Sequence, residues 1–332
     1  MLHKILELPR NQKFLLGFSG GVDSCALFFL LRDEGINFDI AIVDYGVREQ
    51  SKEEVLYAQQ LAQKYGKQIF VLNAPKLDHN FESQARKVRF DFFKKVVLEH
   101  KYRGLILAHQ LNDRIEWLLM QLQKGAGLNV LLGFSFCEEI SGIDVFRPLL
   151  DVSKEELHRF CLQQKIKFFE DESNQDDTFL RNRFRKLSAF LMQNAHGIRS
   201  SFEYLREEKN RLYPDVEVKN LGDIRSFTRT GEAQDLHRVD LECKKMGYVL
   251  SSRQKQEIIK CQFSCEVHRL VIECNDEKIF VAPKVQCVMD EGFRDMARKN
   301  KIPKRLRKNF YLLWKGGIDE QEMRAFFEGT KT

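Results

Sequence analysis

Residues 17–25 read Gly-Phe-Ser-Gly-Gly-Val-Asp-Ser-Cys, and this stretch decides the fold of the first half of the chain. The apolar run Phe14–Phe18 leads into it, and a second apolar run, Cys25–Leu31, follows it. A glycine-rich turn between a strand and a helix exposes backbone N–H groups, to which the helix dipole adds partial positive charge. Gly20 and Gly21 also let the backbone approach a ligand closely. The stretch therefore favours a cradle for an anion over a plain turn.

The first 110 residues alternate between strand-like and helix-like patterns. β-Branched or aromatic runs, typical of strands, lie at 14–18, 38–43, 68–72 and 104–108. Helical patterns lie between them, at about 23–34, 51–65 and 81–100. This alternation predicts an α/β fold, a doubly wound, Rossmann-like parallel sheet with helices on both faces. Polar segments at 19–24, 44–48 and 109–113 follow strands, so we expect them at the carboxyl edge of the sheet, where ligands bind.

The second half of the chain predicts further helices and a separate C-terminal region. Ser153-x-x-Glu156 is a capping box that predicts a helix to about residue 165, and a basic helix follows around Arg181–Arg185. We assign residues 1–195 to the α/β domain, 196–225 to a linking helix and loop, and 226–332 to a smaller α+β region. Within that region we expect a helix at 251–261 and a hairpin formed by 267–273 and 278–281.

The composition is that of an ordinary globular protein. The chain has 332 residues, of which 43% are hydrophobic and 31% are charged, enough for two or three domains with cores of their own. No apolar run reaches the roughly 18 to 20 residues that a membrane helix needs. The N-terminal residues carry charges every few positions, unlike a signal peptide. We expect a cytoplasmic protein without a membrane partner.

Cysteine usage gives no sign of a metal site. The eight cysteines include no Cys-x-x-Cys pair, and Cys261 and Cys265 lack a second pair or a nearby histidine. Structural, reduced cysteines are the expected interpretation.

Positive charge is concentrated near the C-terminus. Residues 191–332 hold 27 basic and 22 acidic side chains, and the stretch 297–308 holds seven basic side chains and no acidic one. Such a run is typical of a surface that neutralises the phosphates of a nucleic acid. A solvated helix face explains the charge alone equally well.

The loop has neither the GxxxxGK[ST] pattern nor the GxGxxG pattern of other phosphate-binding loops. Ser-Gly-Gly-Val-Asp-Ser resembles the PP-loop of the N-type ATP pyrophosphatases, which cleave ATP between its α and β phosphates. The resemblance implies that the loop binds ATP and holds the leaving pyrophosphate. The implied ATP-binding residues are Ser19, Gly20, Gly21, Val22, Asp23 and Ser24.

Asp23 requires a separate explanation, because a carboxylate beside phosphates is repulsive unless a cation lies between them. Mg²⁺ carried by ATP would supply that cation, with no metal site made by the protein alone. Stabilisation of the first helical turn through the helix dipole is a second explanation, compatible with the first.

Further segments resemble one family of PP-loop enzymes, the tRNA(Ile)-lysidine synthases, in order across residues 13–190. The segments are 42–48 (HVNHGLR in the family), 81–90 (ExxARxxRY), 108–116 (AHHxDDQxE), 147–150 (RPLL), and 171–174 with 181–185 (DxSN and RNxxR). A looser match joins 301–307 to the family's IPxxxR segment. The family adenylates the C2 oxygen of the first anticodon cytidine in a tRNA(Ile) with a CAU anticodon. The ε-amine of free L-lysine then displaces AMP.

The resemblance implies roles for individual residues. It makes Asp23, Asp113, Glu116 and Arg89 catalytic, with Asp113 and Glu116 also binding the ammonium groups of lysine. Asp113 and Glu116 lie three apart and so share one helix face. The simpler explanation for this acidic pair is that it favours a helix N-terminus.

The implied tRNA contacts are all basic residues, namely Arg86, Arg181, Arg185, Lys304, Arg305 and Arg307. Arg86 and Arg89 share a helix face and fit either the α-phosphate or the RNA backbone, and a salt-bridged surface helix is the alternative. His109 fits either a contact with the nucleotide or a packed histidine. Members of this family are often dimers, so a homodimer is an assembly that the resemblance allows.

The chain departs from the family pattern at several positions. Ile42 and Tyr45 replace the two histidines of HVNHGLR, and Asn112, Arg114 and Trp117 replace Asp, Gln and Thr. We therefore assign no acid–base role to these five positions.

Three other functions share some of these sequence features. A tRNA 2-thiolation enzyme is the nearest, and many of those carry Cys-x-x-Cys pairs. NAD and GMP synthetases share the loop but do not suit the segments at 81–90 and 171–185. A tRNA-binding protein without activity is the third, and the intact loop and carboxylates argue against it.

Overall fold

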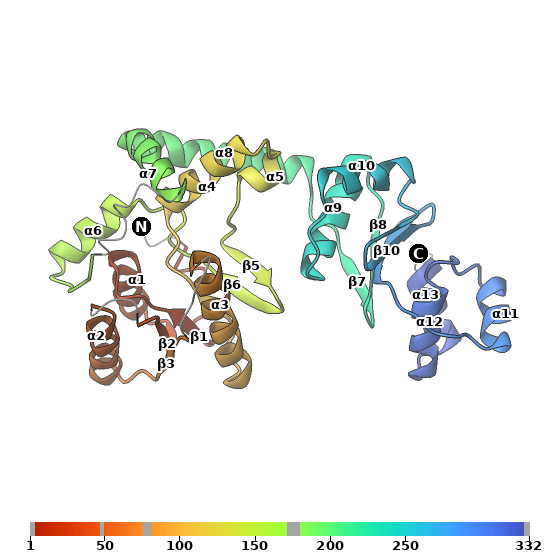
Figure 1. Cartoon of the computed structure of the whole chain (residues 1–332), viewed down its shortest axis with the longest axis horizontal. Helices are drawn as coiled ribbons and strands as arrows, with labels where there is room; N and C mark the ends of the chain where they lie inside the picture. The colour runs from red at the N-terminus through yellow and green to blue at the C-terminus, as the bar shows by residue number, and fades with distance from the viewer. Residues whose placement is uncertain (1–3, 47–49, 76–80, 171–179, 329–332) are drawn as a thin grey trace. The chain divides into compact units, whose positions relative to one another are not determined.

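The computed structural model describes residues 4–46, 50–75, 81–170 and 180–328, except for the side chains of 82, 180–183, 185 and 328. Its chain forms two compact units, Met1–Glu207 and Glu208–Thr332 (Figure 1). The strands of the first unit are β1 (Lys13–Gly17), β2 (Asn37–Asp44), β3 (Ile69–Asn73), β4 (Leu105–Ile106), β5 (Cys137–Ile140) and β6 (Ile143–Phe146). Its helices are α1 (Val22–Asp33), α2 (Gln50–Tyr65), α3 (Phe81–Glu99), α4 (Leu111–Gln123), α5 (Leu128–Leu131), α6 (Lys154–Gln163), α7 (Leu180–Leu191), the short 3₁₀ helix η2 (Met192–Asn194) and α8 (Ala195–Leu212).

The strands of the first unit form one sheet in the order β3-β2-β1-β4-β6-β5. The pairs from β3 to β6 are parallel, and only β5 runs antiparallel to its neighbour β6. The predicted doubly wound α/β fold is confirmed. The β5–β6 hairpin was not predicted, because the sequence of β5, Cys-Glu-Glu-Ile, is short, charged and largely exposed.

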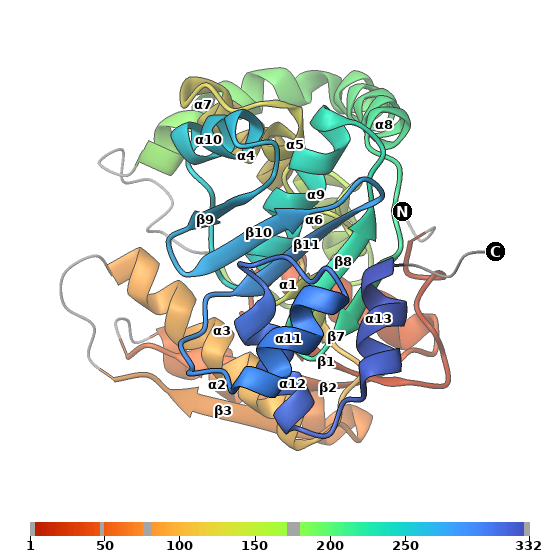
Figure 2. The same ribbon diagram turned by 90° about the vertical axis from the view of Figure 1, so that its right-hand side faces the viewer.

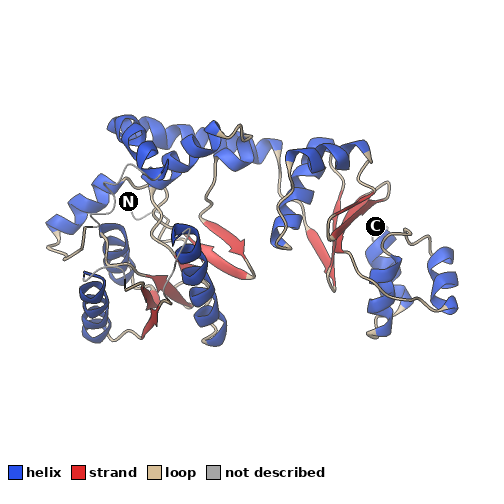
Figure 3. Ribbon diagram, in the orientation of Figure 1, coloured by secondary structure: helices blue, strands red, loops and turns tan. Residues whose placement is uncertain are grey.

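Both faces of this sheet are buried, because alternate side chains of each strand point to opposite faces. On β1, Phe14 and Leu16 pack into a core with α1, α2 and α6, whereas Leu15 packs into a second core with α3. The sheet accordingly lies as a layer between helices (Figure 3). Strands buried on both faces read as continuous apolar runs, which is why the sequence predicted them well.

The topology brings four loops to one edge of the sheet. Because β1, β2, β4 and β6 are parallel, the segments that follow them all leave from the carboxyl edge. These segments are residues 18–21, 45–46, 107–110 and 147–153. β1 and β4 are neighbours, and their connections leave in opposite directions, so the glycine-rich loop lies at the switch point where ligands bind in such sheets.

Helix α8 begins in the first unit and runs past the boundary between the two units at Glu207. Phe202 on α8 packs with Leu111 of α4 and Leu132 after α5. We expected a linking helix and loop at 196–225. This segment also contains a strand at Val218–Leu221 and the start of a strand at Ile224–Thr228, and both strands belong to the sheet of the second unit. Those residues belong to the second unit because their apolar side chains pack into its core.

The second unit is built on an antiparallel sheet in the order β7-β8-β11-β10-β9. Its strands are β7 (Val218–Leu221), β8 (Ile224–Thr228), β9 (Cys265–Val267), β10 (Leu270–Cys274) and β11 (Lys278–Pro283). Its helices are α9 (Glu232–Lys245), α10 (Ser252–Lys260), α11 (Glu291–Lys299), α12 (Arg307–Lys315) and α13 (Glu320–Glu328). The predicted helix and hairpin of this α+β region are present as α10 and the β10–β11 pair.

This second sheet is also covered on both faces. On β11, Phe280 and Ala282 pack with α11, α12 and α13, while Ile279 and Val281 pack with α9 and α10. Figure 2 shows α11 to α13 lying over one face of the strands. None of the helices in the described parts of the chain has both the length and the apolar character needed to cross a membrane.

Candidate active site

The glycine-rich loop connects β1 to α1 in the conformation that an anion cradle requires. Gly20 has φ of +77°, a backbone conformation that side chains disfavour. Gly21 caps α1 with an extended backbone and without a capping side chain, so the first N–H groups of the helix face outward from its end. Ser19 N donates to Ser24 Oγ at 3.2 Å, which draws both hydroxyl groups to the same side of the loop. Asp23 lies in the first turn of α1.

A segment far along the chain supports this loop. Phe169 N donates to Gly20 O at 2.9 Å, and Phe169 pairs with Gly21 in a parallel bridge. A Cβ atom on Gly20 would lie 3.1 Å from Glu54 Cγ and 3.3 Å from the Phe169 ring. Sequence analysis missed Glu54 and Phe169 as neighbours of the loop, since nothing local to either residue signals the contact.

The two cysteines nearest the loop are buried. Cys25 Sγ donates to Gly20 O at 3.2 Å, and Cys161 Sγ donates to Val22 O at 3.7 Å. Burial raises the pKa of both thiols, and the negative charge of Asp23 adds to this effect. The pKa of Cys161 reaches about 11, so this thiol stays protonated near neutral pH.

His109 follows β4 and lies where several charged side chains meet. Burial lowers its pKa to about 4, the Asp113 carboxylate opposes that shift, and Arg147, Arg89 and Arg86 add to it. The ring stacks on Phe134, with centroids 5.0 Å apart and planes 15° apart. Its Nδ1 atom is buried and lacks a hydrogen-bond partner among the described residues. His109 is therefore neutral near pH 7.

The four charged residues that shift the pKa of His109 lie near its ring. Arg86 and Arg89 come from α3 and are exposed, Asp113 comes from the start of α4, and Arg147 follows β6. The first three were predicted as site residues. Arg147 was part of the family resemblance but was given no role.

Asp113 has a structural role at the start of α4. Gln110 N donates to Asp113 Oδ2 at 3.0 Å, and Asn112 N donates to Gln110 Oε1 at 2.5 Å, which together form a capping box. Asp113 therefore stabilises the N-terminus of α4 through its Oδ2 atom, as the simpler explanation for this acidic residue states. Glu116 lies one turn further along α4 and is buried, with 6% of its surface exposed.

Arg147 and Phe134 form the wall beside His109. The Arg147 guanidinium lies 5.3 Å from the Phe134 ring centroid, and its Nη1 atom donates to Glu138 at 2.9 Å and to the Ser135 carbonyl at 3.2 Å. Burial lowers the pKa of Arg147 and the Glu138 charge opposes that shift, so the cation is held in place by its partners. Phe134 lies in a loop without regular structure, and no sequence pattern predicted its role.

Two of the departures from the family pattern hold neighbouring elements in place. Tyr45 Oη donates to the Ala85 carbonyl at 3.0 Å and its ring meets Phe81 edge-on, which fixes the start of α3. Asn112 Oδ1 accepts from Lys154 N at 3.0 Å, so Asn112 helps to satisfy the start of α6.

The other departures also have structural explanations. Arg114 is buried, forms an ion pair with Asp151 at 2.5 Å and lies 3.9 Å from the Phe202 ring centroid, so it ties α4 to α8. Trp117 Nε1 donates to the Val130 carbonyl at 2.7 Å. Ile42 is part of the core. Each of these five side chains makes a hydrogen bond, an ion pair or a core contact within the fold, which agrees with assigning them no acid–base role.

Some predicted residues lie outside the described parts of the chain. The segments 47–49 and 171–179, which carry part of the family resemblance, are among them. The backbone of Arg181 and Arg185 is in α7, as predicted, while their side chains are outside the description.

The three predicted tRNA contacts of the second unit lie between α11 and the start of α12 and differ in their surroundings. Lys304 is exposed. Arg305 forms an ion pair with the buried Glu273 at 3.1 Å, and Arg307 Nε donates to the Ile302 carbonyl at 2.9 Å. Of the three, only Lys304 presents its charge without such a contact among the described residues.

Two carboxylate residues lie close to the loop, Asp23 of α1 and Glu54 of α2. Within the described ranges, no group of three or more His, Cys, Asp or Glu side chains is arranged to hold a metal ion. A carboxylate such as Asp23 fits a metal that is held mainly by the phosphates of a nucleotide.

Comparisons with known proteins point to one family. The chain matches the PP-loop domain family over residues 1–191. It is 48% identical to a tRNA(Ile)-lysidine synthase of Helicobacter pylori, in an alignment that covers 92% of this chain and 91% of the relative. It is 43% identical to a tRNA(Ile)-lysidine synthase of Wolinella succinogenes, over 95% of this chain and 98% of the relative.

A solved structure shares the fold. The U34-tRNA thiolase NcsA of Methanococcus maripaludis superposes with a TM-score of 0.52 at 19% identity, covering 62% of this chain and 77% of that one. The likeness supports the α/β architecture. Together with the loop geometry and the two relatives, the family match shows that this chain belongs to the tRNA(Ile)-lysidine synthases, a family of PP-loop enzymes.

Proposed function

We propose that this protein joins L-lysine to the C2 atom of the first anticodon cytidine in a tRNA(Ile) with a CAU anticodon. ATP first adenylates the C2 oxygen and releases pyrophosphate, and the lysine ε-amine then displaces AMP. The observation that supports the proposal most directly is the 48% identity to a curated lysidine synthase across 92% of the chain. The modified base would pair with A, so the tRNA would read AUA in place of AUG.

The loop is suited to receive ATP. Its outward N–H groups and the hydroxyls of Ser19 and Ser24 would hold the β and γ phosphates that leave as pyrophosphate. Mg²⁺ bound with ATP would neutralise phosphate charge as the α–β bond breaks. Asp23, in the first turn of α1, would contact that ion.

The arginines of α3 are suited to the first step. When the cytidine oxygen attacks, negative charge grows on the α-phosphate, and guanidinium groups nearby lower the energy of that state. Arg86 and Arg89 are exposed and share one face of α3, and both act electrostatically on His109. We assign Arg89 to the α-phosphate and Arg86 to the phosphate or the adjacent RNA backbone.

The carboxylates of α4 are suited to the second nucleophile. Lysine carries two ammonium groups near neutral pH, and its ε-amine must lose a proton before it attacks. Asp113 and Glu116 would bind these cations. His109, neutral near pH 7, would form a hydrogen bond with the substrate through Nδ1, which has no partner among the described residues.

The basic residues of the second unit are suited to the tRNA. We propose that Lys304, with Arg305 and Arg307 beside it, contacts RNA phosphates, which positions the tRNA without reading its sequence. Arg181 and Arg185 on α7 complete the proposed RNA contacts. The proposal also includes action in the cytoplasm and, as the family resemblance allows, a homodimer that light scattering would detect.

A two-stage assay tests this proposal. With an unmodified tRNA(Ile) bearing CAU, ATP and Mg²⁺ but no lysine, we expect pyrophosphate release limited to about one equivalent of tRNA. Adding lysine should release AMP and sustain turnover. If AMP release does not depend on lysine but requires a sulfur donor, the proposal would be overturned in favour of tRNA thiolation. The high pKa of the buried thiols Cys25 and Cys161 makes that outcome unexpected.

A further inference from the structure

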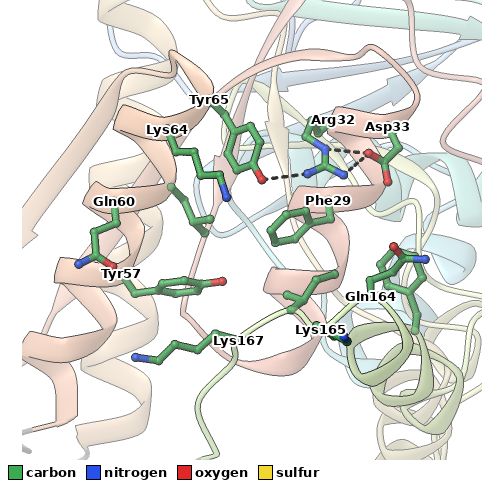
Figure 4. A pocket seen from close by; sticks show the side chains of 13 residues that line it. Phe29, Arg32, Asp33, Tyr57, Gln60, Lys64, Tyr65, Gln164, Lys165 and Lys167 are labelled. Carbon is green, nitrogen blue, oxygen red and sulfur yellow. Dashed lines mark hydrogen bonds and ion pairs between the residues drawn. The ribbon is translucent and has the colours of Figure 1, made fainter.

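A cavity of the first unit is lined by aromatic and basic side chains. It has a volume of about 410 Å³ and lies between α1, α2, α6 and the segment after α6 (Figure 4). A volume of this size lies at the lower end of the range for small-molecule pockets. The glycine-rich loop is not part of its lining.

The charge of this cavity is positive. Arg32, Lys64, Lys165 and Lys167 line it, and Asp33 is the one carboxylate among its lining residues. Arg32 Nε donates to Asp33 Oδ1 at 2.7 Å, so these two charges cancel. The three lysines have no ion pair within the described residues, so their charge is available to an anion.

Aromatic rings form the rest of the wall. Tyr57 extends from α2 with its hydroxyl end toward the middle of the cavity, beside the Lys167 side chain (Figure 4). Lys167 Nζ lies 5.7 Å from the Tyr57 ring centroid, and Lys64 Nζ lies 5.4 Å from the Tyr65 ring centroid. Tyr65 is fixed, because its hydroxyl accepts from Arg32 Nη1 at 3.1 Å. Flat rings beside cations provide a surface for a nucleobase and its phosphate together.

The same segment that carries two of the lysines also supports the glycine-rich loop. Helix α6 ends in a tight turn with Lys165 at φ of +53°, and Ile166 N donates back to the Cys161 carbonyl at 2.8 Å. Three residues later, Phe169 pairs with Gly20 and Gly21 of the loop. A ligand held by Lys165 and Lys167 would therefore restrain the segment after α6 that pairs with the loop.

We propose that this cavity binds one nucleotide unit, separate from the ATP of the glycine-rich loop. The ammonium groups of Lys64, Lys165 and Lys167 lie on different sides of the cavity (Figure 4), so the phosphate would be bound by whichever of them it approaches, and the base would lie against Tyr57. This chemistry is shared by a free nucleotide such as AMP and by one unit of an RNA strand. The site does not depend on which group the enzyme transfers to tRNA.

Photolabelling of the full-length protein tests the site. The probe is 8-azido-AMP, and labelled peptides are identified by mass spectrometry. We expect label on the α2 peptide that contains Tyr57, together with label on peptides of the glycine-rich loop. The Lys64→Gln/Lys167→Gln double variant should lose about 10-fold of the α2 label at a subsaturating probe concentration, since two of the three lysine charges of the cavity are removed.

Two comparisons make the result decisive. Lys124→Gln removes an exposed charge of the same unit outside the cavity and should leave the α2 label unchanged. Label retained on the loop peptides shows that each variant is folded. A wild-type protein labelled only at the loop, or an α2 label that survives the double variant, would overturn the proposal.

Competition then distinguishes the two sources of the nucleotide. If a short oligouridylate displaces the α2 label at a lower concentration than AMP, the cavity takes a unit of RNA. If AMP competes better than the oligonucleotide, it takes a free nucleotide. Failure of both competitors to reduce the α2 label would show nonspecific attachment and contradict the site.

Discussion

His109 is held in its neutral form by the residues that surround it. Its lowered pKa means that the folded protein resists a proton that the unfolded chain accepts near pH 6.5. Between these two values the unfolded state binds more protons, so stability rises with pH and is lost as the pH falls toward about 4.

We predict that the His109→Asn variant loses this pH dependence. Between about pH 7 and about pH 5, wild-type stability of the first unit should fall by about 2 kcal/mol more than that of the variant. Trp117 lies in the first unit and Trp314 in the second, so a Trp314→Phe background lets fluorescence follow the first unit alone. Equal losses in the two proteins would show that His109 is not buried in its neutral form.

Asp113 combines a cap for α4 with a proposed contact to lysine, and one substitution separates the two. Asp113→Asn keeps a side-chain oxygen for Gln110 N–H but removes the charge. We expect stability within about 0.5 kcal/mol of wild type and a KM for lysine raised about 10-fold or more, because bonds to charged groups contribute about 1.5–3 kcal/mol. Pyrophosphate release without lysine should be unchanged. An unchanged KM would limit Asp113 to its capping role.

At the level of elements, the glycine-rich loop depends on the irregular segment after α6, which pairs with the loop through Phe169. Gly20 takes a left-handed conformation with Glu54 and Phe169 against it. Sequence patterns predicted the loop, the first helices and the parallel strands, because buried periodicity and glycine placement are local signals. The support from Phe169 was not predictable, because a pairing between residues about 150 positions apart leaves no local pattern.

We predict that Gly20→Ala impairs ATP use more than stability. A side chain in this conformation costs about 1 kcal/mol, and the added Cβ would also press on Glu54 and Phe169. Gly35→Ala is the matched control, since Gly35 has φ of +69° with nothing within 4 Å of the added Cβ. Gly35→Ala should lose stability from the backbone conformation alone, Gly20→Ala should lose somewhat more because of its two contacts, and only Gly20→Ala should weaken ATP binding, by roughly 10-fold. Equal ATP affinity in the two variants would contradict the role of the loop.

Across the whole molecule, the distribution of charged residues was predictable from sequence, but the contacts that these residues make were not. The run 297–308 is basic in sequence, yet the structure ties Arg305 to Glu273 and Arg307 to a backbone carbonyl. Similarly, Arg147 and Phe134 join the candidate site only because β6 runs parallel to β4 and a loop folds over His109. Such roles depend on tertiary contacts, which single residue types do not encode.

We predict different effects for two substitutions in this basic run. Lys304→Gln should weaken tRNA binding and reduce the slope of log affinity against log salt by about 1, without loss of stability. Arg305→Gln leaves the buried Glu273 without its arginine, so it should lower the stability of the second unit by about 1 kcal/mol. Filter binding over a salt series and thermal melting measure these effects. An unaltered salt slope for Lys304→Gln would remove Lys304 from the tRNA surface.

Incorporation of radiolabelled lysine into tRNA is the most direct measurement of the proposed activity. The purified protein would be given ATP, Mg²⁺ and either unmodified tRNA(Ile) with a CAU anticodon or an elongator methionine tRNA with the same anticodon. We predict label in the isoleucine tRNA and none in the methionine tRNA. Absence of label from both, while AMP still forms on the isoleucine tRNA, would contradict lysine as the nucleophile.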